Sequence, residues 1–377
     1  MNASLNKKLG NVKWGDYKMG ELFQRVKTNK LPYKADELPN QPLGEYTLPC
    51  LTSSFNNQGL NYYAPREGAT ILQNVISIPS NSDVYRAYYQ PNDFTVLSDA
   101  YAIRWIFDDR ELSSRQYLFM VMCINKVTDL PVYSYKNKLG GWNVVKNKHI
   151  QLPQKRGEID FDFMESFIAE LEAERVAELS AYLTVSGLDN YELSSDEENA
   201  LKNYQSLKWD TYNLEKLFGK STRGKRLKGD DRIAGTLPFV TAGEASEGIS
   251  AYISNEVEVF EKNTTTIDMF GSAKYRNYIY GGDDHIAVVH TENLPKYASI
   301  FVTTAIHKSS HNGQFDYGHN FYAKDADALY ISLPVNEAGN PDYDKMAIII
   351  SAIHKLVIKD VVAYSNRKIK ATKAVVK

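Results

Sequence analysis

Short apolar runs between turn-forming residues dominate two long stretches of the chain, 13–153 and 208–334. Runs of four to seven β-branched and aromatic residues bounded by turn clusters are typical of strands. They are NVISI at 74–78, FTVL at 94–97, YAIRWIF at 101–107, IAVV at 286–289 and ALYISL at 328–333. One longer apolar segment interrupts the runs in each stretch, at 113–126 and 297–308, and both are predicted to be helices. Each stretch is therefore predicted to be an α+β domain.

A segment with helical periodicity follows each of these stretches. Apolar residues recur mostly at steps of three and four, the stripe of an amphipathic helix. In 159–183 they are Met164, Ile168, Leu171, Leu179 and Leu183, and in 342–370 they are Met346, Ile349, Ile350, Ile353, Leu356 and Tyr364. Between the two, Ser195 to Glu198 has the spacing of a capping box and predicts the start of a short helix.

The two halves of the chain repeat one another in order, which is the mark of a duplication. Four matches carry the repeat: Lys13-Trp14 then Leu22-Phe23 with Lys208-Trp209 then Leu217-Phe218; TLPCLTSSFNNQGLNYY (47–63) with TLPFVTAGEASEGISAY (236–252); Tyr85-Arg86 with Tyr275-Arg276; and IQLPQKRGEIDFDFMESFI (150–168) with ISLPVNEAGNPDYDKMAII (331–349). The order is kept while the offset drifts, as it does between diverged copies with different loop lengths.

Charge is unevenly distributed although the net charge is only −2. Residues 156–200 hold 13 acidic and 2 basic side chains, whereas residues 342–377 hold 8 basic and 3 acidic ones. The apolar stripes of the two long helices need a partner, and opposite charge favours pairing of one helix with the other over self-association. A pseudo-two-fold relation between the copies would make this coiled coil antiparallel. The alternative is that each stripe packs only on its own domain.

Composition excludes several classes of protein. No stretch approaches 18 consecutive apolar residues, so a transmembrane helix is not expected. Residues 1–12 lack the apolar run of a signal peptide, which predicts a cytoplasmic protein. Cys50 and Cys123 are the only cysteines, too few for a disulfide framework or a cysteine-based zinc site.

Catalytic motifs are not found. Gly219, Gly224 and Lys225 have the spacing of a phosphate-binding loop, but Arg226 stands where the Mg²⁺-binding Ser or Thr is required. No GxGxxG opens a βαβ unit, no Asn-Pro-Pro-aromatic tetrapeptide of amino-methyltransferases occurs, and Asp16-Tyr17-Lys18 lacks the upstream Pro-Asp of a nuclease core. Five histidines could suggest a metal cluster, but polar or ligand-contacting roles are favoured over metal; they are His285, His290, His307, His311 and His319.

What remains is a binding surface made of loops that combine cations with Asn, Gly and aromatic residues. Arg, Lys and Asn supply the donors and acceptors that read guanine and adenine edges, and Lys contacts phosphates. Ordinary turn chemistry is the alternative for each loop taken alone, although the repeated Tyr-Arg pair singles out Arg276 as a guanine contact. The candidate DNA-binding residues are Tyr85, Arg86, Lys136, Lys138, Trp142, Asn143, Lys146, Arg223, Lys225, Arg226, Lys228, Lys274, Tyr275, Arg276, Asn277, His319 and Asn320.

This arrangement resembles the specificity (S) subunits of type I restriction–modification systems and their close relatives. The Trp-x7-Leu-Phe opening, the LPxxT segment and the Leu-Pro…Asp…Met start of the long helix carry the resemblance, each in both copies. It implies a first target-recognition domain at 1–155, a central helical conserved region at 156–206, a second target-recognition domain at 207–341 and a C-terminal helical region at 342–377. One departure is Asn81-Ser82-Asp83, where many relatives have a Gly-rich turn.

The resemblance further implies a non-catalytic, DNA-reading subunit. It would bind double-stranded DNA and two methyltransferase subunits and, through the complex, restriction subunits. S-adenosylmethionine, ATP and Mg²⁺ would be bound by those partners, so this chain would need no cofactor and no metal. Two alternatives stay open: an orphan or decoy subunit that captures methyltransferases without reading DNA, and a nucleotide-dependent enzyme.

Overall fold

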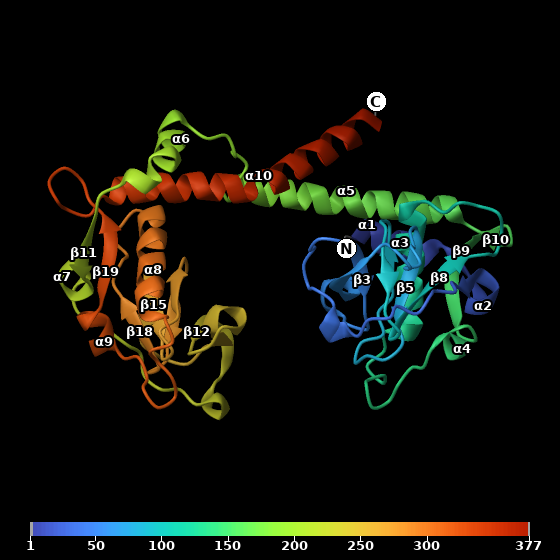
Figure 1. The fold of residues 1–377 in the computed structure, drawn as a ribbon, viewed down its shortest axis with the longest axis horizontal. Helices are drawn as coiled ribbons and strands as arrows, with labels where there is room; N and C mark the ends of the chain where they lie inside the picture. The colour runs from blue at the N-terminus through green and yellow to red at the C-terminus, as the bar shows by residue number, and fades with distance from the viewer. Residues whose placement is uncertain (1–2, 376–377) are drawn as a thin grey trace. The chain divides into compact units, whose positions relative to one another are not determined.

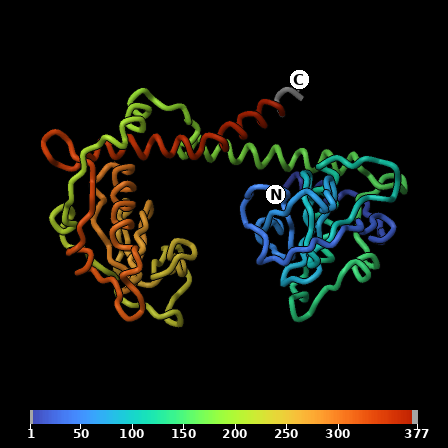
Figure 2. Tube along the Cα trace, in the orientation of Figure 1, coloured from blue at the N-terminus to red at the C-terminus, as the bar shows by residue number. Residues whose placement is uncertain are grey.

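The structure is a computed structural model that describes the backbone of residues 3–375 (Figures 1 and 2). It contains two compact units. Unit 1 comprises the chain up to Leu179 together with the residues from Lys368 on, and unit 2 runs from Ser180 to Arg367. Both units combine helices with small sheets, which confirms the prediction of an α+β fold. Among the described helices, none has the length and apolar character that crossing a membrane requires.

Unit 1 is built on three small sheets with strand orders β1-β9-β10, β2-β8-β5-β6 and β4-β3-β7. Its strands are β1 (Lys13–Lys18), β2 (Phe23–Arg25), β3 (Tyr46–Leu51), β4 (Leu60–Pro65), β5 (Val75–Pro79), β6 (Tyr88–Gln90), β7 (Thr95–Val96), β8 (Ala100–Trp105), β9 (His149–Lys155) and β10 (Glu158–Ile159). Its helices are α1 (Ala3–Asn11), α2 (Met19–Leu22), α3 (Ser114–Thr128) and α4 (Trp142–Val145), with 3-10 turns η1 (Ala35–Glu37) and η2 (Asn56–Gly59); the long helix α5 (Phe161–Val185) starts here.

Unit 2 also holds three sheets, with orders β11-β19, β16-β15-β18 and β13-β12-β17-β14. Its strands are β11 (Trp209–Asn213), β12 (Ala234–Val240), β13 (Ile249–Ile253), β14 (Val259–Phe260), β15 (Thr264–Asp268), β16 (Ala273–Arg276), β17 (Tyr280–Gly282), β18 (Ile286–Val289) and β19 (Tyr330–Pro334). Its helices are α6 (Ser195–Lys202), α7 (Leu214–Phe218), α8 (Lys296–Ser310), α9 (Ala323–Ala328) and α10 (Tyr343–Val375), with 3-10 turns η3 (Tyr204–Ser206), η4 (Gly229–Asp231) and η5 (Ala245–Gly248).

The repeated sequence motifs occupy equivalent places in the two units. The opening tryptophan pairs with the Leu-Pro segment in both: Trp14 of β1 lies opposite Pro153 of β9, and Trp209 of β11 opposite Pro334 of β19. Strand β3 runs parallel to β7 as β12 does to β17. Helices α3 and α8 are each 15 residues long. The structure therefore repeats itself as the sequence does.

Buried strands and stacked aromatic rings hold the central helix of each unit against its sheets. Strand β5 is buried along its whole length, as is β15. Trp14 stacks on Phe119 of α3 with ring centroids 6.4 Å apart, and Trp209 stacks on Phe301 of α8 at 6.1 Å. Apolar contact of this kind contributes about 25 cal/mol for each Å² removed from water.

Both long helices begin in the same way. The backbone N–H of Asp160 donates to the carbonyl of Pro153, and that of Asp342 donates to the carbonyl of Pro334. Each aspartate then caps its helix, because its side chain accepts a backbone N–H three residues on, from Phe163 at 2.9 Å in one case and from Lys345 at 2.9 Å in the other. The start of each long helix is thus fixed to the sheet of its own unit.

Helix α6 is held against α10 within unit 2 by a buried carboxylate (Figure 1). Its capping box lies one residue earlier than the sequence predicted, on Ser194 and Glu197. Glu197 is only 6% exposed and accepts hydrogen bonds from Lys355 Nζ at 2.8 Å and from the Ser351 hydroxyl at 2.7 Å. Burial raises the pKa of Glu197, but the hydrogen bonds from Lys355, Ser194 and Ser351 outweigh it and lower the pKa to about 2.

Replacing Glu197 with Gln should destabilise unit 2 by about 2 kcal/mol at pH 7, because three donors lose a charged acceptor. A depressed pKa contributes stability that is present above the unfolded value of 4.5 and is lost as the pH falls from there toward about 2. Thermal melting of the parent and Glu197→Gln chains should therefore differ at pH 7 and converge below pH 4. Glu198→Gln, at an exposed neighbouring position, is the control. A gap between the curves that stayed constant down to pH 3 would contradict the assignment.

Candidate nucleic-acid interface

Strand register shows that the Tyr85-Arg86 and Tyr275-Arg276 pairs are not equivalent, which corrects the sequence alignment. Arg276 lies opposite Thr264 on β15, whereas Gln90 lies opposite Val75 on β5. The hydroxyl of Tyr275 donates to Asn263 Oδ1, and that of Tyr89 donates to Asn74 Oδ1, both at 2.9 Å. Tyr89-Gln90 is therefore the true counterpart of Tyr275-Arg276.

Arg276 is buried, which argues against its prediction as a guanine contact. It is 1% exposed. Its guanidinium donates to three neutral oxygens: Nε to the Thr266 hydroxyl at 2.9 Å, and Nη1 to the Glu247 carbonyl at 2.8 Å and the Tyr278 hydroxyl at 3.0 Å. Gln90 makes the matching bonds in unit 1, to the Ser77 hydroxyl at 3.1 Å and the Gln58 carbonyl at 3.5 Å. The side chain at this position therefore bonds to a turn in each unit, η2 in unit 1 and η5 in unit 2.

Tyr85 is likewise a core residue, not a contact residue. It is 1% exposed and packs edge-on against Tyr133 with ring centroids 6.2 Å apart. Arg86 is exposed, but its Nε donates to Asp129 at 2.7 Å, so its charge is compensated locally. The structure therefore removes Tyr85 from the candidate surface and leaves Arg86 there as half of an ion pair.

The remaining unit 1 candidates cluster on the segment between α3 and β9. Lys136, Lys138, Asn143 and Lys146 are exposed, and Lys138 Nζ lies 4.8 Å from the ring centre of Tyr135. Trp142 is half-buried against the core and supports the segment from beneath. Figure 1 shows the 130–141 loop at the end of unit 1 that lies away from α5. The structure thus brings these predicted residues together on one free edge.

Unit 2 carries a second exposed basic segment between α7 and η4. Arg223, Lys225, Arg226 and Lys228 are exposed, and within the described residues none of them pairs with a carboxylate. This segment and η4 lie at the end of unit 2 opposite α10 in Figure 1. Exposed cations of this kind are what phosphate binding requires.

Gly224 shows why this basic segment keeps its position. A Cβ added to Gly224 would lie 1.7 Å from the carbonyl oxygen of Gly282, so only glycine lets the segment pack against β17. The Arg232 guanidinium donates to the carbonyl of Leu227 and holds the other end of the segment. Gly224 therefore has a packing role, consistent with rejecting a phosphate-binding loop here.

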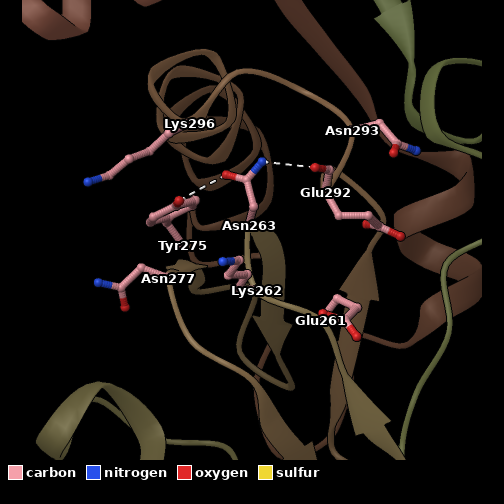
Figure 3. Close-up of a pocket in the computed structure, with 8 residues that line it drawn as sticks. All are labelled: Glu261, Lys262, Asn263, Tyr275, Asn277, Glu292, Asn293 and Lys296. Carbon is pink, nitrogen blue, oxygen red and sulfur yellow. Dashed lines mark hydrogen bonds between the residues drawn. The ribbon is translucent and has the colours of Figure 1, made fainter.

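Two more candidates, Tyr275 and Asn277, line a hollow of about 570 Å³ in unit 2, shown in Figure 3. They line it together with Lys262, Lys296, Glu261 and Glu292. Asn263 at its centre is fully engaged, because its amide donates to main-chain carbonyls, including that of Leu294 at 2.7 Å, and its oxygen accepts from Tyr275. Lys274 points elsewhere and pairs with Glu244 at 3.0 Å.

The histidines are held by hydrogen bonds within unit 2. His307 Nδ1 accepts the N–H of Ala273, which fixes its tautomer, while His311 and His319 reach the carbonyls of Phe270 and Gln314. The side chain of Asn320 lies 3.5 Å from the Tyr322 hydroxyl. The residues that could hold a metal ion together are Asp283, Asp284 and His285, whose ligand atoms lie within 4.8 Å of one another. His285 therefore has two carboxylate neighbours, and both precede it directly in the sequence.

One exposed feature was missed by sequence reasoning. Turns η2 and η5 present Asn56 to Gln58 and Ala245 to Glu247 at equivalent places, each followed by a glycine. The signal was present, because NNQG and ASEG are aligned in the second of the four repeat matches. Neither tetrapeptide contains a lysine or an arginine, so a prediction based on cations did not include these turns.

A family model described as a type I restriction modification DNA specificity domain matches residues 11–181. Residues 11–181 are therefore similar to such a domain. This confirms the resemblance that the repeated motifs indicated.

Two known proteins are similar over larger parts of the chain. The specificity subunit S.BcgI of a type II restriction enzyme from Heyndrickxia coagulans is 23% identical over 241 residues, which is 63% of this chain and 66% of that protein, just under two thirds of its length. The crystal structure of a type I restriction–modification S subunit from M. genitalium superposes with a TM-score of 0.59 at 13% identity, covering 97% of this chain and 94% of the other. The chain therefore shares the fold of that subunit.

Arg276→Ala should destabilise unit 2 by about 3 kcal/mol, because it leaves the buried oxygens of Thr266 and Glu247 without a donor. Arg276→Gln should cost about half as much, since Gln90 makes the matching hydrogen bonds in unit 1. Hydrogen–deuterium exchange of peptides from 240–276 in the full chain measures this local destabilisation. Equal protection in the parent and Arg276→Ala chains would show that the buried guanidinium is not needed.

Proposed function

We propose that the chain is the DNA-reading specificity subunit of a restriction–modification complex, with each unit reading one half of a bipartite duplex site. The observation that supports this most directly is the occurrence in both units of an exposed basic segment at the end away from the long helix. The similarity of 11–181 to a specificity domain and the name of the related S.BcgI subunit agree with it.

In recognition, the cations and the polar side chains of the loops would have different roles. Exposed lysines and arginines at 136–146 and 223–228 contact phosphates and set the position of each unit on the duplex, whereas polar side chains beside them contact base edges. No step of bond chemistry falls to this chain. Two methyltransferase subunits would supply S-adenosylmethionine-dependent methylation, and restriction subunits would supply cleavage with ATP and Mg²⁺.

The distance between the half-sites would be set by the long helices. We propose that α5 and α10 pair as an antiparallel coiled coil, with the target-recognition domains at 1–155 and 207–341 and the helical regions at 156–206 and 342–377. Opposite charge supports the pairing, as do the later positions of the α10 stripe, where Ile353 and Leu356 are exposed. The first positions of each stripe pack on the core of their own unit, Met164 and Ile168 in α5 and Met346 and Ile350 in α10. Helix α5 has 25 residues, about 38 Å, and α10 has 33, about 50 Å, which is comparable with one turn of B-DNA at about 34–36 Å.

Capture of methyltransferases without DNA reading is the second candidate function. The low net charge of residues 201–341 favours it, with 15 basic and 17 acidic side chains. The cations at 223–228 argue against it, because four of them are exposed within six residues of the chain.

Selection from random DNA separates these functions. The purified full chain, alone and co-expressed with a methyltransferase of the same system, is mixed with duplexes of random sequence, and the retained pool is sequenced. DNA reading predicts an enriched motif of two short halves around an unread spacer. A retained pool with no motif in either preparation would contradict DNA reading and leave the capture function.

Removing two of the exposed cations should weaken binding in a salt-dependent way. Each cation withdrawn from the phosphate backbone reduces the slope of log K against log salt by about 0.9, so Lys225→Ala with Arg226→Ala should reduce it by about 2. Lys202→Ala with Lys216→Ala, two exposed lysines outside the basic segment, is the control. Fluorescence anisotropy of the selected duplex between 50 and 200 mM salt measures the slopes. Identical slopes for the two double variants would exclude the segment from the interface.

Lengthening both long helices should lengthen the spacer. Four residues added to α5 and to α10 extend each by about 6 Å, close to two base pairs. The selected motif should keep both half-sites while the unread spacer grows. Four residues added after Asn190, between α5 and α6, should leave the spacer unchanged. A changed half-site sequence with a fixed spacer would contradict the ruler.

A further inference from the structure

The two copies of one turn have nearly the same backbone but different exposed side chains. In η2, Asn57 and Gln58 have φ values of 46° and 54°, and in η5, Ser246 and Glu247 have φ values of 49° and 55°. Left-handed backbone is uncommon for residues other than glycine and is retained only where the surroundings enforce it. Two diverged copies have thus kept the same unfavourable conformation at the same exposed place.

The main-chain hydrogen bond that closes the turn is also the same in the two copies. The N–H of Thr52 donates to the carbonyl of Gly59, and that of Thr241 to the carbonyl of Gly248, each at 2.9 Å. Both glycines have positive φ, and a Cβ at Gly248 would lie 2.7 Å from the Thr241 carbonyl. The same main-chain bond therefore closes the turn in each unit.

In each turn, the main-chain carbonyl of the second left-handed residue accepts a hydrogen bond from a side chain on a neighbouring strand. Gln90 donates to the carbonyl of Gln58 and Arg276 to that of Glu247. Because each hydrogen bond is made to the main chain, the side chains of the tip are left free to differ.

The η5 tip also lies beside the basic segment of unit 2. Strand β12, which leads into the turn, pairs in parallel with β17, and Gly224 of the basic segment packs on Gly282 of β17. Arg232 connects the two directly, because it donates to the carbonyl of Leu227 and to the hydroxyl of Ser250, just after the turn. Side chains at the tip are thus placed next to cations that can contact phosphates.

We infer that η2 and η5 are paired recognition turns that carry base specificity, one for each half-site; the inference rests on the proposed DNA-reading function. The Asn56, Asn57 and Gln58 side chains are exposed amides, which make bidentate contacts with adenine. Ser246 and Glu247 replace them in unit 2, and a carboxylate accepts the amino group of cytosine. Unit 1 therefore selects adenine and unit 2 cytosine at the base pair that each tip meets.

Exchanging the tips tests this directly, since the two backbones already match. One variant carries the unit 2 tip in unit 1 (Asn56→Ala, Asn57→Ser, Gln58→Glu), and the reciprocal variant carries the unit 1 tip in unit 2 (Ala245→Asn, Ser246→Asn, Glu247→Gln). Each full-length variant is put through selection from random duplexes beside the parent. Asp36→Asn, on the exposed turn η1, is the control.

Each tip exchange should alter bases in one half of the motif only, with adenine giving way to cytosine in the unit 1 variant. Thermal melting confirms that the variants fold. For a variant that fails to fold, the nearly isosteric Gln58→Glu and Glu247→Gln substitutions replace it, and each should reduce the preference for the selected base over its replacement by about ten-fold.

The outcomes separate the two proposals. A parent motif that persists unchanged in both folded variants overturns the recognition turns while the motif itself upholds DNA reading. A parent chain that enriches no motif overturns the proposed function and this inference with it. Changes in both halves from a single exchange would also overturn the assignment of one turn to one half.

Discussion

The pairing of the first strand of each unit with the strand that carries its Leu-Pro segment, β1 with β9 and β11 with β19, is the constraint on which the rest of the structure depends. It brings the opening tryptophan opposite the Leu-Pro proline in both units and places that ring on the central helix. Because the capping aspartate bonds back to the same proline carbonyl, the direction in which each long helix leaves is fixed by this ladder. The proposed spacing of the two half-sites would depend on this attachment.

Under the proposed function, the same duplication would let one framework read two different sequences. Main-chain hydrogen bonds hold the exposed turns, and they are kept even where the side chain that makes them has changed from Gln90 to Arg276. The cost of burying a guanidinium with neutral acceptors is offset by four hydrogen-bonded or aromatic neighbours, Thr266, Glu247, Tyr278 and Tyr280. Tip side chains outside these hydrogen bonds are free to diverge while the fold is maintained.

Sequence patterns predicted what depends on periodicity and order: the α+β character, the long helices and the Trp, Leu-Pro and Asp motifs that join them. They could not distinguish a buried cation from an exposed one. Arg276 and Arg223 both follow an aromatic or polar residue in a loop-rich region, yet one is buried under a turn and the other faces solvent. The Tyr85-Arg86 and Tyr275-Arg276 pairs are 190 residues apart, and this offset is close to the offsets of the neighbouring repeat matches. The sequence alone therefore did not show that the two pairs were misaligned. The strand register showed it, because Gln90 lies opposite Val75 as Arg276 lies opposite Thr264.

Photocrosslinking of a bound duplex tests most directly whether each unit reads its own half-site. The selected duplex carries 5-iodouracil in one half or the other, the full chain is irradiated with it, and the crosslinked peptides are identified. The account predicts that one half crosslinks within 55–59 or 135–146 and the other within 223–228 or 244–248. Crosslinks from both halves to the same unit would contradict it.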